Sequence, residues 1–374
     1  MCYRLIYCCF VALLCCSCQG NRRSGVSPEG DTLRLQYAQL LTIVDYDGYS
    51  VASIRDPWNK ARKLHEYVLV PREQVLPDHL PEGTLVRTPV SKAVIYTAVH
   101  SSLVNELGAG KQIAGVCDFQ YIHLPFIIDG VHQGSIVDCG DAMSPDLERI
   151  IDLEPDALLL SPFENSGGYG RVEELGVPIV ECADYMETSA LGRAEWMKFY
   201  GRLFGQTEAA GRLFSEVETS YLALKEQASQ AENKPTVITD LKTGSVWYVP
   251  GGQSTQGKLW ADANATYPYA DDDHSGSLAL SFEAVFDKAG HADIWVFRYN
   301  QPTAMTYKQL AADFHGNAEM KAFKERRVFG CNTSYSLFYE ETPFHPDRLL
   351  RDYIQICHPE LDLGGLKYYE KLNE

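Results

Sequence analysis

Apolar and polar positions alternate along the chain in the pattern of an α/β protein. Short, continuous apolar runs at 93–96, 113–116 and 157–160 predict buried parallel strands. Between the first two runs, residues 101–107 carry apolar side chains at helical spacing. Strands that alternate with helices predict a parallel sheet with right-handed connections.

The segment 144–182 contains one complete helix–strand–helix–strand unit. Ser144 is expected to cap a helix whose first residue is Pro145, and Glu-Pro-Asp at 154–156 ends that helix. A buried strand follows at 157–160, and a glycine-rich loop at 165–170 leads into the next helix. That helix is closed by Gly176, and a second strand follows at 177–180.

The second half of the chain repeats this alternation after a long helical stretch. Residues 193–203 and 207–229 have apolar side chains at helical spacing, and the second segment would be about 35 Å long at 1.5 Å per residue. Further strands and a terminal helix are predicted at 236–239, 246–249, 293–297, 328–331 and 349–357.

Three short motifs carry a resemblance to a known family. Leu-Glu-Arg-Ile at 147–150, Glu-Pro-Asp at 154–156 and Glu-Leu-Gly-Val-Pro-Ile-Val at 174–180 resemble the N-terminal lobe of bacterial ABC-transporter solute-binding proteins for iron-siderophore, haem and cobalamin complexes. The resemblance covers about residues 89–372. Strand-like runs at 33–37 and 49–54 resemble the N-terminal extension of a Bacteroidetes-type subgroup.

The resemblance implies an α/β fold of two Rossmann-like lobes, each with a central parallel sheet, joined by one long interlobe helix. We expect a lipoprotein signal peptide at 1–17 and a flexible tether at 18–30. The N-terminal lobe with its strand extension is expected at 31–190, the interlobe helix region at 191–232 and the C-terminal lobe at 233–374.

The first residues predict export and lipid anchoring. Arg4 precedes a mostly apolar run at 5–14, which is too short to span a bilayer but suits a secretory signal. Leu-Cys-Cys-Ser-Cys then resembles a lipobox, with Cys18 as the acylated residue because Ser17 is the usual kind of neighbour. Cys16 is an alternative, and so is a cleaved signal peptide without lipidation.

Composition narrows the class of partner. The formal net charge of −17 argues against nucleic acid and anionic lipid surfaces. The five cysteines after Cys18 are widely spaced and odd in number, which indicates buried thiols rather than a disulfide framework or a zinc site. We expect a monomer that touches the membrane only through its lipid anchor.

Aromatic residues gather where the predicted strands end. Ligands of open parallel sheets bind beyond the carboxyl ends of the strands, so two facing lobes would line one cleft with aromatic side chains. Arg298 follows an apolar strand and is expected to pair with an anionic chelate, or else with Asp293 or the loop 271–273. The candidate ligand-binding residues are Tyr121, Phe163, Trp247, Tyr248, Arg298, Tyr299 and Tyr335.

The remaining expectations concern mechanism and partners. The resemblance implies no cofactor, and an ABC permease with its ATPase as partners. Glu164 and Glu283 are the acidic residues expected to dock on the permease, with Glu173 or Glu174 as substitutes for Glu164.

Two other functions stay open at this point. One is a metal-dependent enzyme that uses the Asp-Asp-Asp-His loop at 271–274, although we find no P-loop and no G-x-S-x-G motif. The other is a surface-exposed accessory lipoprotein. The ligand itself could be an iron-siderophore, haem or cobalamin, and an axial haem ligand could come from Tyr121, His100 or His123.

Overall fold

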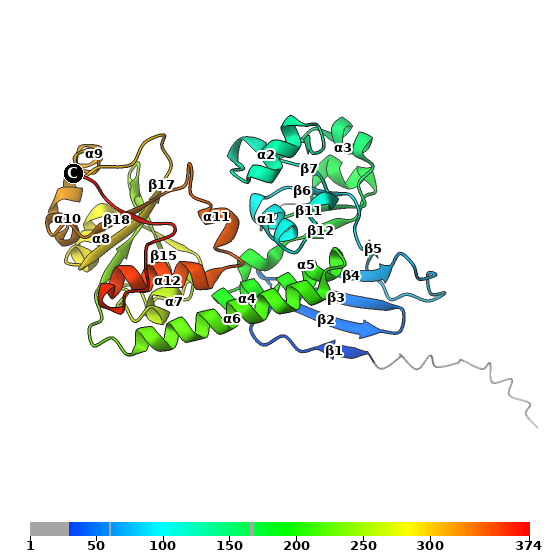
Figure 1. Cartoon of the computed structure of the whole chain (residues 1–374), viewed down its shortest axis with the longest axis horizontal. Coiled ribbons are helices and arrows are strands. Elements are labelled where there is room, and N and C mark those ends of the chain that lie inside the picture. Colours follow the sequence, from blue (N-terminus) through cyan, green and yellow to red (C-terminus); the bar gives the residue numbers. More distant parts are fainter. Residues whose placement is uncertain (1–29, 60, 165–167) are drawn as a thin grey trace, which may run out of the picture.

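The computed structural model describes residues 30–59, 61–164 and 168–374. It has two α/β lobes that lie above one long helix, α6 (Thr207–Ser229), with the N-lobe and C-lobe at opposite ends of that helix (Figure 1). The predicted fold class is confirmed. The proposed signal segment 1–17, Cys18 and nearly all of the tether lie outside the described residues. Within the described residues, none of the helices is long and apolar enough to cross a membrane.

The N-lobe is built on a five-stranded parallel sheet in the order β12-β11-β6-β7-β8. Its strands are β6 (Ala93–Ile95), β7 (Ile113–Val116), β8 (Val137–Asp138), β11 (Ala157–Leu160) and β12 (Ile179–Glu181). Its helices are α1 (Ala98–Glu106), α2 (Pro125–His132) and α3 (Leu147–Leu153), with a 3₁₀ helix at Gly170–Leu175. Every carboxyl end of these strands therefore lies at the same edge of the lobe.

Helix α3 begins later than the sequence predicts. Ser144 and Pro145 form the short strand β10 (Ser144–Pro145), which pairs with β9 (Gly140–Asp141). Asp146 is the N-cap instead, and its carboxylate accepts a hydrogen bond from the Arg149 amide at 3.2 Å. The hairpin pairing takes up Ser144, so the helix begins after Asp146 instead.

The N-terminal extension forms a separate five-stranded sheet, which lies beneath the N-lobe (Figure 1). Its strands are β1 (Asp31–Leu33), β2 (Leu41–Tyr46), β3 (Tyr49–Arg55), β4 (Lys63–Pro71) and β5 (Thr84–Thr88). The pairs are antiparallel except for β4 with β5. Tyr67 packs 6.0 Å from Phe199, which ties this sheet to the helices beside α6.

The strand predicted at 33–37 ends early because two carboxylates bind the backbone that follows it. Glu195 accepts hydrogen bonds from the amides of Gln36, Tyr37 and Ala38 at 2.8–3.1 Å. Glu187 accepts from the next two amides, at 39 and 40. Five consecutive amides are thereby satisfied by side chains rather than by a neighbouring strand, so the segment becomes a loop.

Two short helices precede α6. The segment predicted as one helix at 193–203 is divided at Trp196 into α4 (Ala190–Glu195) and α5 (Met197–Leu203). Trp196 is buried and donates its indole N–H to Glu187 at 3.0 Å. Helix α6 has the predicted bounds.

The C-lobe contains two sheets rather than one. Strands β13 (Val237–Thr239), β17 (Ile294–Tyr299) and β18 (Val328–Asn332) are parallel, and β19 (Glu370–Lys371) joins them antiparallel. The strand predicted at 246–249 is β15 (Val246–Pro250), which lies between β14 (Lys242–Thr243) and β16 (Ser277–Leu280) in a separate antiparallel sheet. The helices are α7 (Thr255–Asp262), α8 (Phe282–Ala289), α9 (Tyr307–Asp313), α10 (Lys321–Lys324), α11 (Phe338–Glu341) and α12 (Pro346–Cys357).

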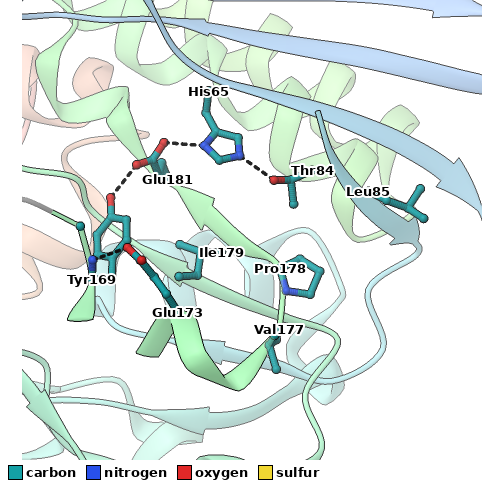
Figure 2. Close-up of a pocket in the computed structure, with 11 residues that line it drawn as sticks. His65, Thr84, Leu85, Tyr169, Glu173, Val177, Pro178, Ile179 and Glu181 are labelled. Carbon is teal, nitrogen blue, oxygen red and sulfur yellow. Dashed lines mark hydrogen bonds and ion pairs between the residues drawn. The ribbon is translucent and has the colours of Figure 1, made fainter. Parts of the chain in front are cut away.

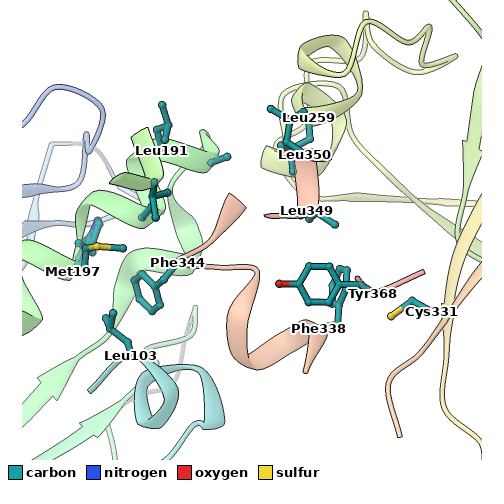
Figure 3. Packing of buried hydrophobic residues seen from close by; sticks show 14 of the residues in the cluster. Leu103, Leu191, Met197, Leu259, Cys331, Phe338, Phe344, Leu349, Leu350 and Tyr368 are labelled. Carbon is teal, nitrogen blue, oxygen red and sulfur yellow. The ribbon is translucent and has the colours of Figure 1, made fainter. Parts of the chain in front are cut away.

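A second connection between the lobes comes from the C-lobe chain around α11, which reaches α1 (Figure 1). Phe344 of this chain segment enters the N-lobe (Figure 3). Its ring packs 5.9 Å from that of His100 and 5.8 Å from that of Tyr200. Beside it, the His345 imidazole pairs with Glu106 of α1 at 2.6 Å. We call residues 338–345 the strap.

We predict that Glu195→Ala lowers the free energy of unfolding by about 3 kcal/mol. The substitution would leave three backbone amides and the Lys198 ammonium, which lies 2.7 Å from Glu195, without their acceptor. Denaturant unfolding measures this change. Glu208→Ala, at the exposed start of α6, is the control and should change stability by less than about 0.5 kcal/mol. Equal stability of the two variants would contradict this role of Glu195.

Candidate functional site

Three adjoining pockets lie between and along the two lobes. The first, the N-lobe pocket, has a volume of about 810 Å³ and lies at the carboxyl ends of the parallel strands. Tyr96 and Thr97 follow β6, Asp118 follows β7, and Ser161 and Phe163 follow β11. The start of α3 forms another wall.

The second pocket, the floor pocket, has a volume of about 390 Å³ and takes residues from both lobes. The N-lobe supplies the segment after β12 and the first turns of α4. The C-lobe supplies the start of α7, the turn before β16 and the start of α12. The residues used below are Tyr185, Glu187, Arg193, Thr255 and Gln256.

The third pocket, the C-lobe pocket, has a volume of about 580 Å³. It lies at the carboxyl ends of β13 and β17 and is lined by Asp240, Tyr248, Arg298, Tyr299 and Tyr339.

We call these three neighbouring pockets together the interlobe cleft. The floor and C-lobe pockets share Ser254, Gln256, Ser275 and Gly276. On the other side, Tyr185 of the floor pocket donates its hydroxyl to the Pro162 carbonyl at 2.5 Å, next to Phe163 of the N-lobe pocket. The cleft therefore extends from the carboxyl ends of one parallel sheet to those of the other, where ligands of such sheets bind.

Four of the seven predicted ligand-binding residues line this cleft. They are Phe163, Tyr248, Arg298 and Tyr299. Tyr121 and Tyr335 are exposed at 65% and 53% but line none of the pockets described.

Trp247 is a correction to the prediction. Its side chain has no exposed surface and packs 5.5 Å from Trp295 and 6.2 Å from Phe282. Its indole N–H donates to the Thr239 carbonyl at 2.9 Å. Trp247 lies inside an antiparallel strand, not at the end of a parallel one, so in this structure it contributes to the C-lobe core and has no surface for a ligand.

Arg298 already has an anionic partner within the protein. Its guanidinium lies 2.7 Å from Asp240 and 5.6 Å from the centre of the Phe338 ring. Burial opposes the charge of Arg298, but the Asp240 carboxylate outweighs it and raises the pKa of the guanidinium further. This partner differs from Asp293 and from the loop 271–273. Any anion in the C-lobe pocket must therefore compete with Asp240.

A buried ionic cluster lies beneath the floor pocket. Asp184 is fully buried and contacts His100 Nε2 at 2.8 Å, the Tyr200 hydroxyl at 2.7 Å and Arg193 Nε at 3.0 Å. Burial would lower the pKa of His100, but Cys182 and Asp184 outweigh it and raise that pKa to about 10. Burial would raise the pKa of Asp184, but His100 and Arg193 lower it to about 2. His100 and Asp184 thus each favour the charged form of the other.

A fourth hollow, of about 620 Å³, lies between the extension and β12 and shares Gly168 and Tyr169 with the N-lobe pocket (Figure 2). His65 bridges Thr84 at 2.7 Å and Glu181 at 3.2 Å, and the Tyr169 hydroxyl donates to Glu181 at 2.7 Å. These bonds connect the extension to the edge of the N-lobe sheet.

Both predicted docking acids are exposed. Glu164 follows Phe163 at the rim of the N-lobe pocket, and Glu283 lies in the first turn of α8, after the N-cap Ser281. Hydrogen bonds from its own amide and from Ser281 stabilise the Glu283 carboxylate and lower its pKa.

The loop 271–274 is a turn rather than a metal centre. His274 contacts Asp272 at 3.0 Å through Nδ1 and at 2.9 Å through its amide. Among the residues that the structure describes, there are no groups of three or more His, Cys, Asp or Glu side chains arranged to hold a metal ion. The five cysteines after Cys18 are all buried free thiols, as predicted.

Sequence reasoning missed Asp240, Gln256 and Arg193. Asp240 comes directly after a predicted strand, so the rule that selected Arg298 could have selected it too. Arg193 and Gln256 lie in the first turns of helices, and the hydrophobic pattern marks only the opposite faces of those helices.

Comparisons with known proteins agree with this architecture. The family model for periplasmic binding proteins matches residues 93–335, which is more than half of the chain. An uncharacterized lipoprotein of Methanocaldococcus jannaschii is 24% identical over 369 residues, covering 92% of this chain and 86% of that relative.

Two solved structures are similar in fold. One is a possible iron-binding periplasmic solute-binding protein of Staphylococcus epidermidis, with a TM-score of 0.57 and 18% identity over 72% of this chain and all of that one. The other is a periplasmic heme-binding protein of Pseudomonas aeruginosa, with a TM-score of 0.58 and 16% identity over 76% of this chain and 99% of that one. At these identities the likeness shows the fold alone.

Two α/β lobes joined by a long helix match the fold of the class III periplasmic binding proteins. The chain belongs to the periplasmic binding protein family. Members of this family bind solutes, are not enzymes and carry no cofactor, so the enzyme alternative at 271–274 is rejected.

We predict that Asp184 makes stability depend on acidic pH. Its folded-state pKa of about 2 lies below the ordinary value of 3.8, so its contribution is present above about pH 4 and is lost as the pH falls toward 2. Between pH 6 and pH 3, the wild-type free energy of unfolding should fall by about 1 kcal/mol more than that of Asp184→Asn. Denaturant unfolding at both pH values measures the difference. Parallel losses in the two proteins would contradict the assignment.

Proposed function

We propose that this protein is the lipid-anchored substrate-binding component of an ABC importer and that it captures an iron-siderophore or related metal chelate. The observation that carries the proposal is the set of neighbouring pockets between the carboxyl ends of the two parallel sheets. Its N-lobe end presents Phe163, and its C-lobe end presents Tyr248, Tyr299 and Arg298. Aromatic faces beside polar groups suit a large, flat and partly apolar ligand.

Haem or cobalamin in the same cleft is the alternative ligand. For haem, His100 is no longer a candidate axial ligand because both of its ring nitrogens are engaged inside the buried cluster. Tyr121 and His123 remain as candidates. Tyr121 and Tyr335 would have to reach a ligand from outside the pockets described.

Cys18 is the proposed site of lipidation, with 1–17 as the signal peptide and 18–30 as the tether. The lobes would span 31–190 and 233–374, with 191–232 between them. A lipoprotein relative supports an anchored position in the cell envelope. The anchored protein would face the periplasm, act as a monomer and deliver its ligand to the permease and ATPase. The rival placement, a surface-exposed accessory lipoprotein, would be labelled by impermeant reagents on intact cells.

We expect calorimetric titration with ferric siderophores, hemin and cyanocobalamin to show binding of one of these chelates. Tyr248→Ala should weaken that binding by about 0.5–1.5 kcal/mol, because it removes an exposed aromatic face from the C-lobe pocket. Tyr46→Ala, in the extension sheet, is the matched control and should bind at wild-type strength. If the protein binds none of these chelates, the proposed function is wrong.

Docking on the permease is proposed to use Glu164 and Glu283, one on each lobe. Glu283→Arg should leave ligand affinity unchanged but weaken association with the permease roughly tenfold, because charges on the rim govern docking rather than the cleft. Glu208→Arg, an exposed reversal on α6, is the control. Binding to permease-containing nanodiscs and uptake of labelled ligand measure the two effects. Transport at the wild-type rate in the Glu164→Arg/Glu283→Arg double variant would reject both assignments.

A further inference from the structure

Three arginines line the cleft. Arg171 is exposed at the N-lobe pocket, whereas Arg193 and Arg298 are half-buried and differ in how much charge they leave for a ligand. In the C-lobe pocket, Arg298 and Asp240 form a one-to-one pair, so their charges cancel. In the floor pocket, Asp184 is shared by Arg193 and the His100 imidazole. The Asp184 carboxylate is thus divided between two partners, and Arg193 is the one that lines the cleft.

The donors of Arg193 are only partly used. Within the described residues, its hydrogen bond to Asp184 is made by Nε alone, at 3.0 Å. Both Nη groups therefore remain for a ligand, while the bond at Nε fixes the plane of the guanidinium. Its side chain is 24% exposed, which leaves it reachable from the pocket. A guanidinium held at Nε keeps the edge formed by its two Nη groups, which is suited to two oxygen atoms of one anion.

The acidic side chain in the same pocket does not oppose this charge at close range. The Glu187 carboxylate is turned to the extension, where it accepts bonds from the amides of Gln39 and Leu40 and from the Trp196 indole. The Lys258 ammonium, bound to the Thr188 carbonyl at 2.9 Å, adds a further positive charge beside the pocket. Two basic side chains, Arg193 and Lys258, therefore lie at or beside the pocket, while the Glu187 carboxylate is engaged elsewhere.

The backbone adds to the same field. Helix α7 begins in the wall of the floor pocket, and its first two residues, Thr255 and Gln256, line that wall. The N-terminus of a helix carries a partial positive charge from its unpaired amides. This contribution supports the arginine and does not replace it.

We propose that the floor pocket is an oxyanion-binding subsite centred on Arg193, which takes a carboxylate or a similar oxyanion group of the ligand. The inference rests on the proposed function, because it assigns a chemical class to the ligand of the same cleft. The anionic group would lie between the lobes and touch both of them, with the bulk of the ligand against the aromatic residues of the outer two pockets. The group could belong to a metal chelate or be a free inorganic oxyanion.

The test is calorimetric titration of the purified protein with three probes. Ferric citrate is an anionic chelate, ferrichrome is a neutral ferric chelate, and sodium molybdate is a free oxyanion. We expect ferric citrate to bind more tightly than ferrichrome, and Arg193→Gln to weaken it at least tenfold. Arg193→Lys keeps the charge but loses the pair of Nη donors, so its affinity for ferric citrate should lie between those of the wild type and Arg193→Gln. Arg212→Gln, an exposed change on α6, should bind like the wild type.

The outcomes distinguish a metal chelate from a free oxyanion as the source of the anionic group, and they distinguish failure of the subsite from failure of the proposed importer function. Loss of molybdate binding in Arg193→Gln, with citrate bound no better than ferrichrome, would support the subsite with a free oxyanion as its ligand. Equal affinity of the wild type and Arg193→Gln for both anions would overturn it. Wild-type protein that binds neither anion at millimolar concentration would overturn it too, even if a neutral chelate binds and the importer function stands. Thermal unfolding of each variant shows whether lost affinity reflects lost structure. If Arg193→Gln is unfolded, the affinity of Arg193→Lys decides between the two outcomes.

Discussion

Phe344 belongs to the C-lobe chain but is buried in the N-lobe, between the rings of His100 and Tyr200. Wide opening of the cleft would expose this side chain, whose burial is worth about 1.5–3 kcal/mol, and would separate His345 from Glu106. Helix α6 opposes the same motion because it runs beneath both lobes (Figure 1). The geometry of the cleft therefore depends on this strap, and small rotations of the lobes are the motions that it permits.

The strap also joins the packing of the cleft to its electrostatics. The rings that enclose Phe344 belong to residues that bind Asp184, so the same contact keeps water from the buried cluster. The chain as a whole carries a net charge of −17, which would repel an anion at long range. Salt screens exposed charges beyond about 8 Å under physiological conditions, whereas buried ones are screened less. The half-buried Arg193 guanidinium in the wall of the floor pocket therefore acts locally, where a bound anion would lie.

The fold was more predictable than the site. The strands at 113–116 and 157–160 and the helix at 207–229 were predicted with the bounds observed, because strong apolar patterns define them. The start of α3 and the end of β1 were not, since a hairpin and two distant carboxylates determine them. Trp247 was misassigned because periodicity alone does not distinguish a parallel strand from an antiparallel one.

The floor pocket was beyond the reach of sequence patterns. Its residues come from three separate segments, at 185–193, 254–276 and 342–349, and they meet only because the strap and α12 return to the N-lobe side. Arg298 was recognised from its place at a strand end, but its neutralisation by Asp240 depends on the pairing of β13 with β17. Which charged side chains of the cleft are already paired could therefore be determined only from the three-dimensional structure.

The central claim is that ligand binds between the lobes and contacts both of them. Hydrogen–deuterium exchange with and without a chelate that binds in titration tests this claim most directly. The account predicts slower exchange on ligand binding in segments of both lobes that line the floor pocket, at 185–193, 254–259 and 342–349. Protection confined to one lobe, or to the hollow between the extension and β12, would contradict it.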